Sequence, residues 1–229
     1  MLCGRDMALP SDLPDLDRLG RAPRLALAYA PTSRRALVAA LLVLDEQFAG
    51  FVRNASEPVL AQMRLAWWRD RFAQDPSDWP QGNPLLAQFA DLGLEARHLG
   101  GVVDGWEHVL DERPLGEYQI AAHARGRASG WAALANHFDH PESAAAAERA
   151  AMRWMLVDFA WHIAEEEEEE RGTALAVACT LGRAVKLPRA LRTAGVLGGL
   201  AARSLETGRP PLSRASDMTT ALRIGLFGR

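Results

Sequence analysis

A helical repeat of apolar residues near the start of the chain restricts its fold most strongly. Between Arg34 and Val52, large apolar side chains recur every three or four residues: Leu37, Leu41, Leu44, Phe48 and Phe51. This spacing places them on one face of an α-helix, which has about 3.6 residues per turn. Alternating runs of Val, Ile and Thr are missing, while Ala and Leu are in large excess. The sequence therefore predicts an all-α protein.

The rest of the chain also divides into helices, separated by breaks rich in Pro, Gly and Asp. Helices are expected from a Ser56 cap to Phe72 and over 84–93, 95–110, 118–138, 144–164, 172–185 and 189–205. Residues 75–84 should form a loop, and the tail should be only partly ordered. We therefore predict a single-domain helical bundle over 25–205, with an N-terminal extension (1–24) and a C-terminal tail (206–229).

Composition and charge restrict the class of function. The chain has 229 residues, of which 48% are hydrophobic, enough for one substantial core. A net charge of -3 with scattered Lys and Arg argues against a nucleic-acid partner. Cys3 and Cys179 stand far apart, so neither a disulfide framework nor a thiolate metal site is expected. No leader and no membrane-spanning apolar run is found, which predicts a soluble, cytoplasmic protein.

Two adjacent tryptophans lie in the segment "NASEPVLAQMRLAWWRDRF". If Leu60 and Met63 face inward, Trp67 belongs to the core and Trp68 points about 100° away from it. Trp68 would then lie among basic residues, a composition favoured at protein interfaces. The candidate interaction surface consists of Arg64, Trp68 and Arg69. The alternative is that Trp68 packs on a neighbouring helix of the same bundle.

Acidic residues provide the candidate metal ligands. In "VVDGWEHVLDER", one helical face would gather three carboxylates: Asp104, Glu107 and Asp111. Such a face can hold Mg²⁺, although a solvated polar face is the commoner use and is favoured here. The run Glu165–Glu170 should be frayed and solvated, because its like charges repel around every side of a helix. Among the six histidines there is no HExxH motif, and no GxSxG or phosphate-loop motif is found.

The tryptophan segment carries a resemblance to a known family. "EPVLAQMRLAWWRD" is similar to the pattern E-P-x-x-x-x-x-R-L-x-W-W-R-D of the squalene/phytoene synthase family. The resemblance continues through "NPLLAQF" and "LGGVVDGWEHVLDERPLGEY" and covers roughly 25–205. It is closest to the catalytically degenerate branch that includes the mitochondrial respiratory complex I assembly factor. It implies a helical bundle of the isoprenoid synthase type.

Active members of this family join two isoprenyl diphosphates head to head and bind Mg²⁺ through two Asp-rich motifs on facing helices. The first motif should fall near "FAGFVRN", where the aligned residues Ala49, Gly50 and Arg53 offer no cation ligand. The second should fall near "VDFAWHIAEEEE". There Asp158 is out of place, His162 and Ile163 stand in for an Arg-Asp pair, and only Glu166 or Glu167 can supply the last acid.

The loss of both motifs implies a protein with no catalytic residue and no cofactor, which acts by binding. The leading hypothesis is an interaction or assembly factor whose partner is a protein such as a respiratory complex component. One alternative is a divergent isoprenyl diphosphate transferase that uses Mg²⁺ and displaced carboxylates. The other is a non-catalytic carrier of a prenyl or lipid ligand, in the cytoplasm or at the membrane periphery. A prenyl-sized cavity would favour the carrier, and carboxylates facing one another across it would favour the transferase.

Overall fold

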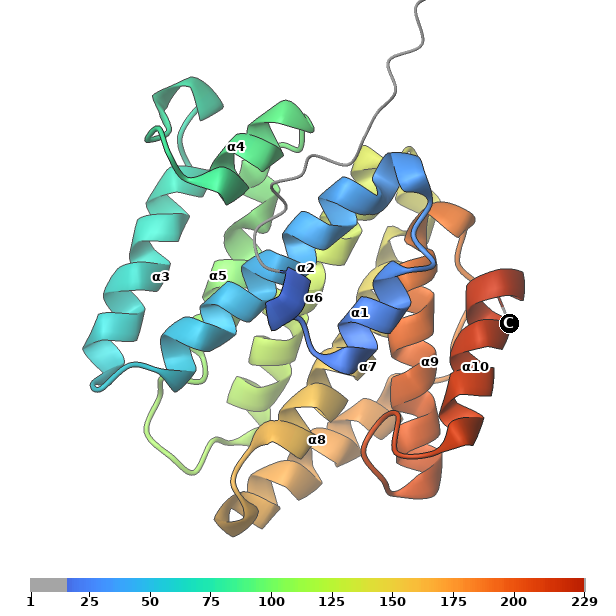
Figure 1. Cartoon of the computed structure of the whole chain (residues 1–229). Helices are drawn as coiled ribbons and strands as arrows, with labels where there is room; N and C mark the ends of the chain where they lie inside the picture. Colours follow the sequence, from blue (N-terminus) through green and yellow to red (C-terminus); the bar gives the residue numbers. More distant parts are fainter. Residues whose placement is uncertain (1–15, 229) are drawn as a thin grey trace, which may run out of the picture.

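The computed structural model describes residues 16–228, which form a helical bundle (Figure 1). Its α-helices are α1 (Arg21–Leu27), α2 (Thr32–Arg53), α3 (Pro58–Phe72), α4 (Pro84–Asp91), α5 (Gly100–Glu107), α6 (Glu117–His137), α7 (Ala144–His162), α8 (Glu168–Thr180), α9 (Arg192–Thr207) and α10 (Ala215–Phe227). Short 3-10 helices span Leu16–Arg18, Pro76–Asp78, Ala96–Leu99, Pro141–Ser143, Glu165–Glu167 and Arg189–Leu191. The described residues contain no strand, so the predicted all-α class is confirmed. Cys3 and the first part of the expected N-terminal extension lie outside the described residues.

Helices α6 and α7 pack against each other at the middle of the bundle. Helix α6 also packs on α5, and α7 also packs on α8 and α9. Figure 1 shows α3 and α4 at one side of the molecule and α9 and α10 at the opposite side. Within residues 16–228, no helix has both the length and the apolar character needed to cross a membrane.

Two glycines bring α5 and α6 into backbone contact. A Cβ added to Gly105 would lie 2.7 Å from the backbone nitrogen of Arg127, and one added to Gly126 would lie 2.6 Å from the carbonyl oxygen of Gly101. A larger residue at either position would push the helices apart. The close approach places the guanidinium of Arg127 over the ring of Trp106, 4.5 Å from its centroid.

The orientation of α3 differs from the prediction. Trp68 is buried, with 2% of its surface exposed, whereas Trp67 is 38% exposed. The buried positions of α3 are Ala61, Leu65, Trp68 and Phe72. The prediction that Trp67 faces the core together with Leu60 and Met63 is therefore wrong, since all three are exposed.

Aromatic packing explains why Trp68 is the inward residue. Its ring makes an edge-on contact with Phe48 of α2, at 5.7 Å between centroids, and a tilted contact with Phe72 at 5.4 Å. Phe72 in turn meets Phe89 of α4. Aromatic rings contribute large buried areas at such distances. Apolar residues occur on every side of α3, so the sequence period alone did not determine which side faces the core.

The glutamate run is more ordered than predicted. It passes from a 3-10 helix into the first turn of α8, which begins at Glu168. Acidic residues in a first turn interact favourably with the helix dipole. Glu170 is buried, accepts a hydrogen bond from the backbone nitrogen of Leu115 at 2.8 Å and pairs with Arg113 at 2.6 Å. The expectation of a frayed, solvated segment is therefore wrong for Glu170.

Several helix boundaries also differ from the prediction. The segment expected as one helix over 95–110 contains a 3-10 helix and then α5, which ends at Glu107. Helix α3 begins at Pro58, with Glu57 rather than Ser56 at its N-cap. The tail, expected to be partly ordered, forms α10, which packs on α9 through residues such as Ala221. The expected loop at 75–84 is confirmed over 75–83 apart from one 3-10 turn, and Pro84 is the first residue of α4.

Candidate functional site

A pocket, called here the central pocket, lies between α1, α2, α6 and α7. Its volume is about 420 Å³, within the range of about 300–1,000 Å³ found for small-molecule sites. Loop residues Pro210, Pro211 and Leu212 close one side of it. Its apolar wall includes Leu42, Ala49, Val52, Trp154, Met155, Phe159, Trp161 and Ile163. A pocket with such a wall is suited to an apolar ligand.

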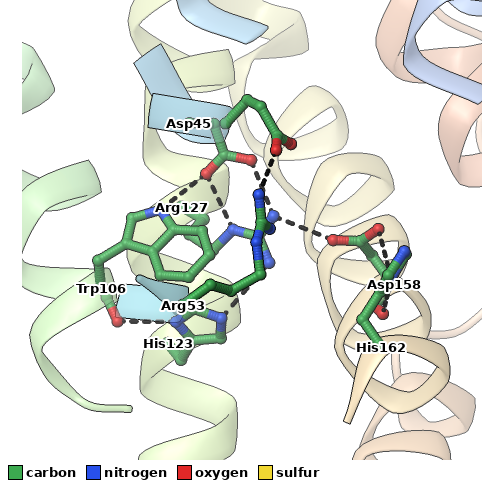
Figure 2. A network of polar contacts seen from close by, with 9 residues as sticks. Asp45, Arg53, Trp106, His123, Arg127, Asp158 and His162 are labelled. Atoms are coloured by element: carbon green, nitrogen blue, oxygen red, sulfur yellow. Dashed lines mark hydrogen bonds and ion pairs between the residues drawn. The ribbon is translucent and has the colours of Figure 1, made fainter. Parts of the chain in front are cut away.

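Three charged side chains from three helices meet at the polar end of the central pocket (Figure 2). Arg127 of α6 donates two hydrogen bonds to Asp45 of α2, from Nε to Oδ1 at 2.9 Å and from Nη2 to Oδ2 at 2.8 Å. The same Nη2 donates to Oδ2 of Asp158 of α7 at 3.2 Å. Arg127 therefore bridges two carboxylates that belong to different helices.

Neighbouring side chains hold this bridge in place. The Nε1 of Trp106 donates to Oδ1 of Asp45 at 2.9 Å, so the carboxylate accepts hydrogen bonds from two residues. The ring of His123 stands edge-on to Trp106, with 4.7 Å between centroids, and its Nδ1 lies 2.9 Å from the carbonyl oxygen of Gly105. Fixed aromatic neighbours of this kind restrict the rotamers of charged groups.

The charges of the bridge stabilise one another. Burial opposes the charged form of Arg127, but attraction to Asp45 and then to Asp158 outweighs it and raises the pKa of the guanidinium. Burial likewise opposes ionisation of Asp158, and its hydrogen bonds with His162 and Arg127 overcome that effect and lower its pKa. Both groups are therefore charged at neutral pH, as buried ion pairs require.

The two histidines beside the bridge differ in charge at neutral pH: His123 is neutral, whereas His162 is protonated. Burial, followed by repulsion from Arg127, lowers the pKa of His123 to about 3, so this imidazole is neutral. The hydrogen bond and attraction of Asp158 raise the pKa of His162 above its ordinary value. His162 lies at the pocket rim with its side chain 75% exposed. Neither histidine is placed as the base of a nucleophile in the described part of the chain, since neither forms a hydrogen bond with a Ser, Cys or Thr side chain there.

The acidic residues of the central pocket do not fit a magnesium site. Mg²⁺ requires several free oxygen ligands in near-octahedral geometry. Asp45 and Asp158 are engaged by Arg127, and Glu46 pairs with Arg53 at 2.5 Å. Among the described residues, no group of three or more potential ligands could hold a metal ion. A cation at this position would have to displace the guanidinium of Arg127.

The sequence analysis missed Asp45 and Arg127, although both gave a signal. Asp45 lies one residue after Leu44 on the side of α2 that carries the apolar stripe, and Arg127 lies between Ala124 and Ala128 on the buried side of α6. Charged residues on the apolar side of a helix are rare unless they are paired. Two such residues of opposite sign on separate helices indicate a buried ion pair.

The three predicted acidic residues do not come together. Asp104 and Glu107 both pair with Arg69 of α3, at 2.5 and 2.7 Å, on a solvent-exposed surface between α3 and α5. Asp111 lies beyond the end of α5, so it does not share their helical face. These carboxylates are not among the lining residues of the central pocket.

The predicted interaction surface is divided by the orientation of α3. Trp68 is buried, which contradicts its placement on an exposed face. Arg69 extends to the carboxylates of α5, and the guanidinium of Arg64 lies over the ring of Phe51 at 5.6 Å. The exposed aromatic residue of this helix is Trp67.

Several positions that the resemblance aligned with the catalytic motifs surround the central pocket. Ala49, Arg53 and Ile163 line it, and so does Asp158, which the motif comparison left out of place. Glu167 does not line the pocket, but it pairs at 2.6 Å with Arg113, which does.

Comparisons with known proteins give no relative for this chain: no family model, no curated protein and no solved structure matches it.

Proposed function

We propose that this protein is a non-catalytic, squalene/phytoene synthase-like binding protein whose central pocket holds an apolar chain of the prenyl or lipid class. The Arg127 bridge is the observation that carries the proposal, because it engages Asp45 and Asp158 while apolar side chains line much of the remaining wall. A prenyl or acyl chain binds such walls by removing its surface from water. Binding without turnover is the function that fits both features.

The transferase alternative has less support. Two carboxylates do lie on opposite sides of the polar end of the pocket, as that alternative requires. They flank a guanidinium rather than a set of free ligands, however. A diphosphate leaving group needs metal ions or unpaired cations to neutralise it, and this stabilisation is commonly worth several kcal/mol. Arg127 is already neutralised by the two acids.

Titration of the purified protein with farnesol tests the binding proposal. Trp106, Trp154 and Trp161 line the central pocket, so binding should change the tryptophan fluorescence. Val52→Phe narrows the pocket and should weaken binding at least about tenfold, which corresponds to about 1.4 kcal/mol. Val59→Phe places the same change on the exposed side of α3 and is the matched control. A lack of any saturable response to farnesol would overturn the proposal.

Incubation with farnesyl diphosphate and Mg²⁺ tests the non-catalytic part. We expect no head-to-head condensation product, because no group of three or more potential ligands within residues 16–228 could hold the metal. A product that forms with Mg²⁺ and disappears with EDTA would instead establish the transferase alternative.

A protein partner is a second candidate, favoured by an exposed apolar face on α3. Its members are Val59, Leu60, Met63 and Trp67, which are 48%, 41%, 65% and 38% exposed. Exposed apolar clusters rimmed by charge often mark interaction sites. Met63→Glu should abolish a stoichiometric complex isolated from native cells, whereas Tyr118→Glu, at an exposed site on α6, should leave it intact. Recovery of the complex with Met63→Glu would exclude this face.

A further inference from the structure

A second pocket, called here the basic pocket, lies between the end of α8, α9 and α10. Its volume is about 850 Å³, and it shares no lining residue with the central pocket. Six basic side chains line it: Arg153, Arg183, Lys186, Arg192, Arg203 and Arg223. Glu206 is the one acidic residue among its lining residues in the described part of the chain.

The acids near the basic pocket neutralise one of its cations. Arg203 pairs with Glu206 at 3.3 Å and lies 3.9 Å from Asp217. Within residues 16–228, the other five cations form no ion pair with a carboxylate. Like charges gathered around one hollow repel one another, so the pocket carries an unbalanced positive potential.

Two of the unbalanced cations are buried. Arg192 is 8% exposed; its Nη1 donates to the carbonyl oxygen of Ile224 at 2.9 Å, and its Nε has no hydrogen-bond partner. Arg153 is 4% exposed and donates to the carbonyl oxygen of Gly182. Burial lowers the pKa of both guanidinium groups, with further repulsion from neighbouring arginines. A buried cation without a counter-charge is costly, and a bound anion would remove that cost.

We propose that the basic pocket binds an anion that carries a phosphate group. Guanidinium groups present several donors in a planar fork that matches phosphate oxygens, and lysine adds a point charge. Arg183, Lys186 and Arg223 are exposed around the opening, whereas Arg192 and Arg153 lie beneath them. A ligand therefore meets three exposed cations first, and the buried Arg192 then offers an Nε donor that has no other hydrogen-bond partner in the described residues. The phosphate can belong to a soluble phosphoester or to the headgroup of an anionic lipid.

A purely structural role accounts for part of this arrangement. Arg192 contacts a carbonyl of the last turn of α10, where a cation interacts favourably with the helix dipole. That role gives no reason for Arg183, Lys186 and Arg223 to line the same hollow, since within residues 16–228 none of these side chains forms a hydrogen bond with a helix end. The exposed residues are therefore the ones to change.

The test compares two triple variants with the same change in net charge. Arg183→Gln, Lys186→Gln and Arg223→Gln together remove three charges from the basic pocket. Arg24→Gln, Arg97→Gln and Arg125→Gln remove three exposed charges that line neither pocket. All six side chains are exposed, so both variants should fold, and circular dichroism with thermal melting checks this.

Binding of inorganic phosphate is measured by calorimetry, and binding to vesicles by sedimentation with phosphatidylcholine alone or with added phosphatidylglycerol. We expect the pocket variant to lose at least about tenfold in affinity and the control to stay within about twofold. If the pocket variant loses affinity for inorganic phosphate, the ligand is a soluble phosphoester. If it loses affinity only for vesicles that contain phosphatidylglycerol, the ligand is a lipid headgroup. Either result supports the proposal. Absence of binding in all assays, or equal losses in both variants, would overturn it. The outcome is independent of the farnesol titration, because the pockets are separate.

Discussion

The central and basic pockets each contain a buried arginine, and the two arginines differ in what surrounds them. Arg127 is 5% exposed and receives two carboxylates from other helices, which raise its pKa. Arg192 is 8% exposed, has a backbone carbonyl as its hydrogen-bond partner within residues 16–228, and has a lowered pKa. The fold itself balances the first charge. The second is left for solvent or a ligand to balance, and this difference is why we propose anion binding at the basic pocket and an apolar ligand at the central pocket.

Substitution of Arg127 should produce the largest loss in the free energy of unfolding, and it tests the arginine whose charge is balanced by carboxylates. Arg127→Met leaves Asp45 and Asp158 facing each other without a cation. Breaking a buried ion pair by removing one partner costs about 3–5 kcal/mol. We expect a loss of this size in the free energy of unfolding, measured by urea denaturation. Arg125→Met, two residues earlier on the exposed side of α6, should change it by less than about 0.5 kcal/mol. Equal effects of the two substitutions would contradict the bridge.

Trp68 gives a reference value for the two arginines, because it shows what the loss of a buried side chain without a charge costs. Trp68→Ala removes a ring held between Phe48 and Phe72 and should cost about 3–4 kcal/mol, the lower part of the range for aromatic truncations in cores. Trp67→Ala, on the exposed side of the same helix, should cost less than about 1 kcal/mol. Denaturation midpoints of the two variants give the contrast directly. A larger loss for Trp67→Ala would restore the orientation of α3 predicted from the sequence.

The pH dependence of stability tests the surroundings of Arg127, because His123 is buried beside it and stays neutral there. Its pKa is about 3 in the native protein. The unfolded value is about 6.5, so below that pH the unfolded chain takes up a proton that the native protein does not. Stability should therefore fall as the pH is lowered, by up to about 1.4 kcal/mol per pH unit and by about 2 kcal/mol in total between pH 6.5 and 4.5.

The variant His123→Gln isolates this contribution. It cannot take up the proton, so its free energy of unfolding should depend less steeply on pH than that of the unmodified protein in this range. His140→Gln changes a partly exposed histidine near the end of α6 and should keep the full slope. If His123→Gln left the slope unchanged, the acid sensitivity would have to come from other groups.

The sequence was a good guide to the fold class and to the long helices. The apolar stripe of α2 and the small residues of α6 predicted both helices to within two residues of their ends. Prediction was wrong on α3, because Trp67 and Trp68 are equally apolar and only a contact with another helix, that of Trp68 with Phe48 of α2, distinguishes them. It was also wrong on the tail, where α10 is stabilised by packing on α9 rather than by its own periodicity.

The candidate sites depend on contacts between residues that lie far apart in the sequence. Asp45, Arg127 and Asp158 belong to three helices, so no local motif joins them. The candidates chosen from local spacing, such as Asp104 and Glu107, turned out to pair with Arg69 of another helix. The basic pocket was missed for the same reason, because its cations come from the middle of α7, from α9 and α10, and from the loop after α8.

Removal of Arg192 should produce the smallest effect on stability and tests the unbalanced side of the comparison. Arg192→Met deletes one hydrogen bond to Ile224, worth about 0.5–1.5 kcal/mol, but it also removes a buried cation that has no carboxylate partner. These contributions oppose each other, so we expect the free energy of unfolding to change by less than about 1 kcal/mol. The same substitution of an arginine by methionine at Arg127 should cost several times more. In buffer with inorganic phosphate, the unmodified protein should gain stability relative to Arg192→Met, because only it keeps the full set of donors. A loss at Arg192 as large as that at Arg127 would mean that the fold balances this charge as well, and would remove the distinction between the two pockets.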